Sequence, residues 1–303
     1  MQEKILELNS LVKEFDTKRA VDNIGFSLKR GEILGLLGPN GAGKTTTIRM
    51  IMNIIVPDSG EIKILGEKFN ESLKNKIGYL PEERGLYRKL KVMETIEFFA
   101  ELKGMKTDEI RRKAEVLLAK FNLLDYKDKK VEELSKGMAQ KLQIIITIIH
   151  SPELLILDEP FSGLDPVNIE MVKDIILEKK KEGVSIIFST HLMDFAEKLV
   201  DKVVMINKGK KVLDGELNEI KSQYGKRFVK VSYDGDSSYI STLDYVESFK
   251  DYGNEIEVEL KDVKYKDEFL KDLSGKFSIN SFVLTEPSLN NIFIRKINEG
   301  EAK

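Results

Sequence analysis

Short apolar runs, separated by turns that contain glycine or proline, recur along the first two thirds of the chain. Apolar runs of strand length predict buried strands, and apolar residues that recur every three or four positions predict helices. Their alternation is typical of an α/β fold. The expected strands cover 5–8, 24–28, 32–37, 61–65, 77–80, 154–157, 184–189 and a hairpin of 203–206 with 210–213, and the expected helices cover 44–55, 92–102, 108–121, about 134–150 and 166–181.

A second and smaller pattern occupies the end of the chain. We expect two domains, at 1–223 and 224–303, and the second is predicted to be a small α+β domain. It is either a structural appendage or a regulatory or partner-binding part, and the sequence leaves both interpretations open. Its expected strands cover 228–233, 254–260 and 277–284, with helices over 265–273 and near 286–293.

Composition excludes several classes of protein. The chain has 303 residues with 49 basic and 51 acidic side chains, and its formal net charge of -2 argues against a nucleic-acid partner. It has no cysteine, which excludes disulfides and thiolate metal sites. No segment reaches the ~20 apolar residues of a membrane span, and the first residues form no apolar signal region. We expect a cytosolic protein that can still dock on a membrane protein.

The stretch between the strand at 32–37 and the helix at 44–55 carries the clearest chemistry. Two glycines bracket four residues and are followed by Lys and Thr, which is the pattern of a phosphate-binding loop. Glycines let backbone N–H groups approach a polyphosphate, and the N-terminus of the helix adds partial positive charge. Lys44 can reach the β- and γ-phosphates, and the Thr45 hydroxyl can ligate Mg²⁺. The loop consists of Gly38, Pro39, Asn40, Gly41, Ala42, Gly43, Lys44, Thr45 and Thr46.

Two adjacent carboxylates, Asp158 and Glu159, follow the buried strand at 154–157. Delivering two charges from a buried strand is costly unless they have a function, and ligands bind at this end of parallel strands. Asp158 can hold Mg²⁺, and Glu159 can orient and deprotonate a water aimed at the γ-phosphate. The alternative is a pair of strand-end salt bridges, which the phosphate loop upstream makes the weaker interpretation.

Three further features are weaker when each is taken alone. Ser135 is a good N-cap and Gly137 leaves backbone N–H groups accessible for a second anion site, but this stretch alone favours a plain capped helix start. His191 follows the strand at 184–189 and is a candidate sensor of the γ-phosphate, although a lone histidine is more often structural. Phe15 is a core or edge aromatic unless it stacks on a base.

The phosphate loop, Leu134-Ser-Lys-Gly-Met138, the strand with its paired carboxylates, Ser162 to Asp165 and His191 occur in one order along the chain. In this combination the sequence closely resembles the ATP-binding subunit of ABC transporters over roughly residues 3 to 220. The resemblance implies a P-loop NTPase core of the ABC type with an antiparallel β subdomain and a helical subdomain, the latter at about 83–150. It also implies an ATPase with ATP and Mg²⁺ as its ligands.

The resemblance assigns roles to matching positions. Residues 38–46 would form the Walker A loop, Asp158 would close Walker B, and Glu159 would be the catalytic base. His191 would be the switch histidine, and Phe15 would stack on adenine. Ser135 and Gly137 would belong to the signature motif, and Asp165 to the D-loop, all of which in this family meet ATP held by a second subunit. Glu82 occupies the position of the Q-loop glutamine and would contribute an oxygen ligand for Mg²⁺.

Departures from the commonest motifs indicate which branch of the family the sequence resembles. Lys136 and Met138 replace residues of Leu-Ser-Gly-Gly-Gln, and Glu82 replaces glutamine. These variants, together with the tail, resemble the branch whose permease is of the ABC-2 type, including sodium-exporter ATPase subunits. The implied function is ATP-driven dimerisation that powers an exporter, with the protein peripheral on the inner face of the cell membrane. One alternative is a soluble ABC-type ATPase acting on a ribosome or DNA, and another is a nucleotide-binding regulatory protein.

Overall fold

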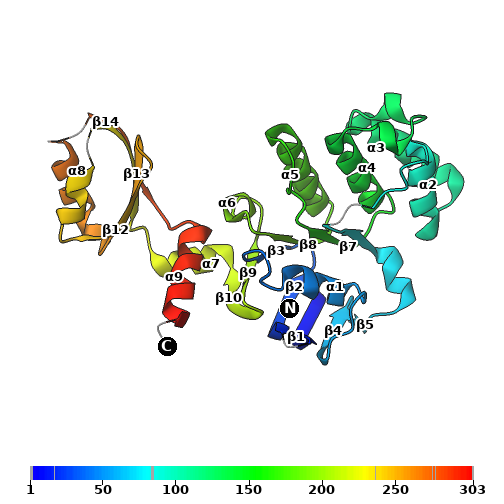
Figure 1. Ribbon diagram of the computed structural model, residues 1–303, viewed down its shortest axis with the longest axis horizontal. Helices are drawn as coiled ribbons and strands as arrows, with labels where there is room; N and C mark the ends of the chain where they lie inside the picture. The colour runs from blue at the N-terminus through cyan, green and yellow to red at the C-terminus, as the bar shows by residue number, and fades with distance from the viewer. Residues whose placement is uncertain are drawn as a thin grey trace. The chain divides into compact units, whose positions relative to one another are not determined.

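The computed structural model describes residues 3–16, 18–82, 85–235, 237–274, 276 and 278–301. The chain divides into two compact units, at Met1–Gly215 and Glu216–Lys303. The boundary lies eight residues before the one expected from the sequence, because helix α7 (Leu217–Tyr224) belongs with the second unit. Figure 1 shows the elements of both units along the chain.

The centre of the first unit is a mixed sheet in the strand order β10-β9-β3-β8-β7-β6. Strands β3, β7 and β8 are buried at every position, and β3 pairs in parallel with both β8 and β9. Continuous Ile, Leu and Val runs form such strands because both faces of a parallel sheet are covered. The strands are β3 (Ile33–Leu37), β6 (Ile77–Leu80), β7 (Leu154–Asp158), β8 (Ser185–Thr190), β9 (Lys202–Asn207) and β10 (Lys210–Glu216).

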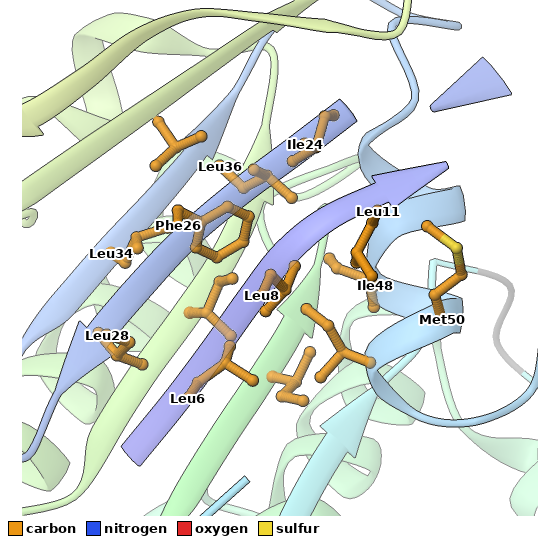
Figure 2. Close-up of a cluster of buried hydrophobic side chains, with 14 of the residues drawn as sticks. Leu6, Leu8, Leu11, Ile24, Phe26, Leu28, Leu34, Leu36, Ile48 and Met50 are labelled. Carbon is orange, nitrogen blue, oxygen red and sulfur yellow. The ribbon is translucent and has the colours of Figure 1, made fainter. Parts of the chain in front are cut away.

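An antiparallel sheet in the order β2-β1-β4-β5 packs against this centre through apolar side chains. Figure 2 shows Leu6, Leu8 and Leu11 of β1 next to side chains of β2, β3 and helix α1. The alternation of apolar and polar residues along β1 and β2 produces one buried face and one wetter face. The elements are β1 (Lys4–Phe15), β2 (Lys18–Lys29), β4 (Ser59–Ile64), β5 (Glu67–Lys68) and α1 (Lys44–Ile51).

Helices α2, α3 and α4 contact one another and form the helical subdomain expected at about 83–150 (Figure 1). Helix α5 follows β7, and the short α6 follows β8. These elements are α2 (Val92–Leu102), α3 (Thr107–Lys120), α4 (Lys136–Ile148), α5 (Pro166–Lys181) and α6 (Met193–Ala196), with 3-10 turns at Glu71–Lys76, Leu124–Tyr126 and Val131–Glu133. The P-loop α/β fold with its antiparallel and helical subdomains is thus confirmed.

The second unit has a sheet in the order β12-β13-β11-β14. Helix α8 packs its buried Phe269 and Leu273 into an apolar cluster with Val229, Val231 and Val258 of the sheet. The remaining elements are β11 (Phe228–Asp234), β12 (Val246–Asp251), β13 (Glu255–Leu260), β14 (Ser278–Thr285), α8 (Lys266–Ser274) and α9 (Leu289–Glu301), with 3-10 turns at Ser238–Thr242 and Val263–Tyr265.

Candidate active site

The phosphate-binding loop has the backbone that its glycines predict. Gly38, Gly41 and Gly43 have φ angles of 154°, 75° and 111°. A Cβ at Gly38 would lie 2.2 Å from the Ile206 carbonyl oxygen, and one at Gly43 would lie 2.4 Å from that of Ala20. Any side chain at these two positions would therefore push the loop away from β9 and β2.

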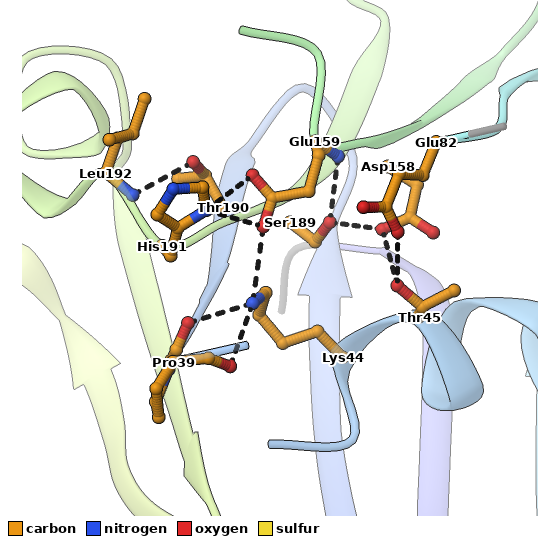
Figure 3. Close-up of polar contacts among 11 residues, drawn as sticks. Pro39, Lys44, Thr45, Glu82, Asp158, Glu159, Ser189, Thr190, His191 and Leu192 are labelled. Carbon is orange, nitrogen blue, oxygen red and sulfur yellow. Dashed lines mark hydrogen bonds and ion pairs between the residues drawn. The ribbon is translucent and has the colours of Figure 1, made fainter. Parts of the chain in front are cut away.

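Lys44 begins α1 and points back under the loop. Its ammonium donates to the carbonyl oxygens of Gly38 at 2.8 Å and Pro39 at 3.2 Å, and lies 3.3 Å from Glu159 Oε1 (Figure 3). The side chains of Lys44 and Glu159 are each only 5% exposed. A buried ammonium with weak carbonyl partners and one carboxylate partner is a strong attractor for phosphate oxygens.

Asp158 and Thr45 meet below the loop. Thr45 Oγ1 donates to Asp158 Oδ1 at 3.3 Å and lies 3.5 Å from Glu82 Oε2 (Figure 3). Ser189 of β8 also donates to Asp158 Oδ1, at 2.5 Å. Burial raises the pKa of Asp158, as do the negative charges of Glu82 and Glu159, while the hydroxyls of Ser189 and Thr45 lower it. Asp158 Oδ2 is buried and accepts no hydrogen bond from the described residues.

Glu159 has a left-handed backbone, with φ of 47°. This conformation costs an ordinary residue about 1–2 kcal/mol, and the Ser189 hydroxyl supports it by accepting from the Glu159 N–H at 3.0 Å. The turn places the Glu159 carboxylate between Lys44 and His191. The Nδ1 atom of His191 lies 3.1 Å from each of the two carboxylate oxygens of Glu159 (Figure 3). The strand end thus separates the two acids: Asp158 toward Thr45, Glu159 toward Lys44 and His191.

A cavity of about 340 Å³ lies over the loop. Phe15, which is 44% exposed, lines it together with the loop, Glu82 and Glu159. Lys18 and Ala20 also line it and were not expected; their only signal is that they follow Phe15 on the next strand. Of the expected nucleotide ligands, Asn40, Gly41, Gly43, Lys44, Thr45 and Thr46 line the cavity, and Gly38, Pro39 and Ala42 support it from behind.

Ser135, Gly137 and Asp165 form a second group that does not line this cavity. Ser135 caps α4 by accepting from Met138 N–H at 3.2 Å, and Asp165 caps α5 by accepting from Asn168 N–H at 3.0 Å. The two helix starts are neighbours, since a Cβ at Gly137 would lie 2.9 Å from Asn168 Nδ2. Accepting these hydrogen bonds also lowers the pKa of Asp165.

Gln140 and Ser189 are site residues that the sequence did not single out. Gln140 is buried and donates to the Pro160 carbonyl at 2.9 Å, which ties α4 to the segment after Glu159. Ser189 reaches Asp158 because the register of β7 and β8 pairs these two residues. Within the described part of the chain, no helix combines the length and apolar character needed to cross a membrane.

Comparison with known proteins identifies the families that the two parts of the chain match. Residues 21–162 match the family described as ABC transporter, and residues 215–297 match the family described as ATP-binding protein DrrA1-3-like, C-terminal domain. The latter match begins at residue 215, one residue before the second unit.

Individual relatives and a solved structure indicate the same family. The chain is 43% identical to the uncharacterized ABC transporter ATP-binding protein YhaQ of Bacillus subtilis, covering 97% of this chain and 98% of that protein. It is 34% identical to the ABC transporter ATP-binding protein NatA of the same organism, over 71% of this chain and 91% of the relative. A solved ATP-binding subunit of an ABC transporter superposes with a TM-score of 0.68 at 33% identity, covering 73% of this chain and 93% of the other.

These similarities cover both units and support the transporter over a ribosome- or DNA-acting ATPase. The geometry agrees with this family: a glycine loop encloses a buried lysine, a hydroxyl contacts one carboxylate, and a second carboxylate lies beside a histidine. The chain belongs to the ATP-binding subunits of ABC transporters, which bind and hydrolyse ATP to drive transport.

Proposed function

We propose that this subunit powers an exporter by closing head to tail with a second ATPase subunit around two ATP molecules. The observation that carries the proposal is the separation of two groups on one chain. The phosphate loop, Lys44 and Glu159 line one cavity, whereas Ser135, Gly137 and Asp165 lie outside it at the starts of α4 and α5. A second subunit, either identical or a close paralogue, would bring its α4 start to this cavity.

In this proposal the residues around the cavity share the work of hydrolysis. Phe15 stacks on adenine, and the loop N–H groups with Lys44 stabilise the charge of the phosphates. As Lys44 turns to the phosphates, Glu159 is released to orient and deprotonate the attacking water. His191 holds the Glu159 carboxylate in place from the other side, at 3.1 Å.

Mg²⁺ fits the polar atoms beside the loop. Asp158 Oδ2 is buried and has no donor among the described residues, while Asp158 Oδ1 and Glu82 both contact the Thr45 hydroxyl. Among the described residues no group of three or more His, Cys, Asp and Glu side chains could hold a metal alone, which suits an ion that is shared with phosphates. When bound, the ion would neutralise charge on the phosphates, and Thr45, Asp158 and Glu82 would hold it.

Members of this family work with transmembrane permeases. A groove of about 390 Å³ between the end of α1, strand β6, α2 and α4 offers a docking place for such a partner. Beside it, Ile54, Tyr87 and Leu102 are more than half exposed despite being apolar or aromatic. A permease of the ABC-2 type would hold the subunit at the inner face of the cell membrane.

Two relatives support export as the direction of transport. The chain is 35% identical to the linearmycin resistance ATP-binding protein LnrL of Bacillus subtilis and 34% identical to the probable multidrug ABC transporter ATP-binding protein YbhF of Escherichia coli. Resistance and multidrug proteins remove compounds from cells. By this similarity the subunit drives export, and substrate choice belongs to the permease.

Glu159→Gln tests the assignment of the base. The amide keeps the size of the side chain but cannot accept a proton, so ATP binding should persist while turnover falls on the order of 10²–10⁴-fold. Steady-state hydrolysis with calorimetric ATP binding measures both. Hydrolysis at the wild-type rate would remove Glu159 from this role.

Mixed dimers test the shared site in the Glu159→Gln background. Lys44→Ala damages the loop of one chain, and Ser135→Arg blocks the α4 start of the other. Neither variant alone should form an ATP-bound dimer, but their mixture has one site with both parts intact. ATP-dependent heterodimer, followed by size exclusion with two tags, is the expected result. The control is dimer formation by Glu159→Gln alone; if it dimerises and the mixture of folded variants does not, the shared site is wrong.

A further inference from the structure

The second unit contains a cavity of about 490 Å³ that is separate from the nucleotide site. The unit's sheet has two faces, because successive side chains of a strand point to opposite sides. Along β13, Ile256, Val258 and Leu260 enter the apolar cluster with α8, whereas Glu257 and Glu259 line the cavity on the other side. Helix α9 covers that side with Asn291, Ile292 and Arg295.

Much of the cavity wall is apolar or aromatic. Tyr224 and Phe228 present rings to it, and Ile292 and Pro287 close it near the start of α9. Its volume lies within the range of ~300–1,000 Å³ that is usual for small-molecule sites. The cavity is therefore suited to a ligand with an apolar body of aromatic size.

Glu257 is the polar group in this wall that is left incompletely satisfied. It is only 8% exposed, and its Oε2 accepts from Asn291 Nδ2 at 3.3 Å. Its Oε1 is buried and accepts no hydrogen bond from the described residues. Lys230 Nζ lies 3.7 Å from Oε1, too far for a hydrogen bond, and its side chain is 46% exposed. A buried carboxylate oxygen without a donor destabilises the fold unless a ligand provides one.

Three other charged side chains of the wall, Glu259, Arg295 and Glu299, form ion pairs. Glu259 is held by Arg227 at 2.9 Å and by Arg295 at 3.0 Å. Lys250 donates to Asn291 Oδ1 at 3.1 Å and not to a carboxylate. The lining residues include four carboxylates, at Glu247, Glu257, Glu259 and Glu299, and two basic groups, at Lys250 and Arg295, so the surplus charge of the wall is negative. The described part of the unit also has no cluster of His, Cys, Asp and Glu that could hold a metal ion.

We propose that this cavity binds a small organic cation, an ammonium group carried on an aromatic-sized apolar body. The ammonium donates to Glu257 Oε1 and takes the place of the Lys230 side chain, which moves into solvent. The body packs against Tyr224, Phe228 and Ile292, and the two rings add cation–π attraction for the charge. The site lies wholly within residues 216–303, so its failure would leave the proposed nucleotide chemistry untouched.

Three indole compounds of similar size test the charge that the cavity selects. Full-length protein with labelled isoleucine δ1-methyl groups is titrated with tryptammonium chloride, with the neutral alcohol tryptophol, and with indole-3-acetate. Ile292 and Ile294 line the cavity and report binding, while Ile33 and Ile187 in the core of the first unit serve as internal controls. Ligands of this size bind with a Kd on the order of 1 mM.

The expected result is that tryptammonium shifts the Ile292 and Ile294 signals and tryptophol does so about tenfold more weakly, because its neutral hydroxyl can donate to the carboxylate but lacks the positive charge of the ammonium. Equal binding of the cation and the alcohol would overturn the proposal. Preferred binding of indole-3-acetate, or no shift with any of the three, would overturn it as well.

A matched pair of variants locates the recognition. Glu257→Gln should weaken tryptammonium binding about tenfold and tryptophol binding little. Glu255→Gln makes the same change of charge on the same strand at an exposed position outside the cavity, and it should bind like the wild type. The Ile256 methyl signal reports whether each variant is folded. If both variants bind tryptammonium equally well, Glu257 does not recognise the cation and the proposal is wrong.

Discussion

At the scale of single residues, the main feature of the site is the placement of its negatively charged side chains. Glu159 lies beside the buried ammonium of Lys44, while Glu82 and Asp158 both contact the neighbouring Thr45 hydroxyl. Carboxylates this close oppose one another's ionisation, which is one cause of the raised pKa of Asp158. A bound cation would relieve that opposition. The acid side of the pH profile should therefore depend on the charge at position 82.

Glu82→Gln should move the acid limb of ATP hydrolysis to lower pH. Asp158 must be ionised to hold a cation, and its raised pKa makes activity fall at a higher pH than an ordinary aspartate would. Removing the Glu82 charge lowers the pKa of Asp158, so activity persists further into acid. The pH dependence of Mg²⁺-supported turnover measures this. Glu82→Asp keeps the charge and is the control; coincident limbs for all three proteins would contradict the expectation.

His150 should make the first unit less stable in acid. Its Nε2 bonds the Ile77 carbonyl at 3.1 Å, and burial, followed by the charge of Lys103, lowers its pKa from 6.5 to about 4. The unfolded chain therefore takes up a proton between these values while the folded chain does not. Stability should decrease from pH 6.5 to pH 4 by about 3 kcal/mol from this group, and no further below.

Urea unfolding of the wild type and of His150→Gln across that pH range tests this. Glutamine can still donate to the Ile77 carbonyl but does not titrate, so its stability should change less with pH. Parallel curves for the two proteins would show that His150 does not titrate differently on folding.

At the scale of elements, periodicity predicted most of the first unit. The bounds of β6, α2 and α5 agree with the expected ranges, because each begins and ends at a clear change of pattern. Helix α1 ends at Ile51, short of the expected Ile55, since Asn53 adopts a left-handed backbone. Strand β12 was missed because its burial does not alternate, and α7 because only two of its eight residues are buried.

Periodicity could not predict which contacts hold the loops in position. The turn between β9 and β10 supports the phosphate loop from behind: Gly209 N–H donates to the Ala42 carbonyl at 2.9 Å, and Asp22 N–H donates to the Gly209 carbonyl at 2.8 Å. These contacts join segments that are distant in sequence. The pairing of Ser189 with Asp158 depends in the same way on strand register.

Gly209→Ala should weaken both stability and ATP binding. Gly209 has φ of 79°, and an added Cβ would lie 3.0 Å from the carbonyl oxygens of Arg19 and Ala20. Gly66 has the same φ with open space around it, so Gly66→Ala is a matched control. The control should lose about 1–2 kcal/mol of unfolding free energy and no ATP affinity. Calorimetric ATP binding and urea unfolding separate the two; equal ATP affinities would exclude support of the loop by this turn.

At the scale of the whole molecule, the chain divides into two compact units, and the expected nucleotide ligands all lie in the first. These ligands all precede Leu192 in the sequence. The tail carries none of the expected motifs and matches a separate family. The motifs could be located from sequence because each depends on neighbouring residues. The boundary was placed too late because α7 carries little periodicity.

A chain ending at Glu216, the last residue of β10, should still bind Mg-ATP with the affinity of the full-length protein. The residues that line the nucleotide cavity all lie between Phe15 and Glu159. A chain ending at Gln223, which keeps most of α7, is the comparison. Calorimetry measures binding, and unfolding curves verify that each chain is folded. Loss of binding by a folded shorter chain would mean that the second unit completes the site.

The strand order of the central sheet also determines when the site can exist during synthesis. Strand β3 leads into the phosphate loop, yet its partners on either side are β8 and β9, which lie far later in the sequence. At ~5–20 residues per second, a ribosome needs roughly ten seconds or more to deliver them. Until then the growing chain exposes an apolar strand with both edges unpaired, which is a target for aggregation and for chaperones. ATP therefore cannot assist the early folding of this unit, and binds only once nearly all of it has been made.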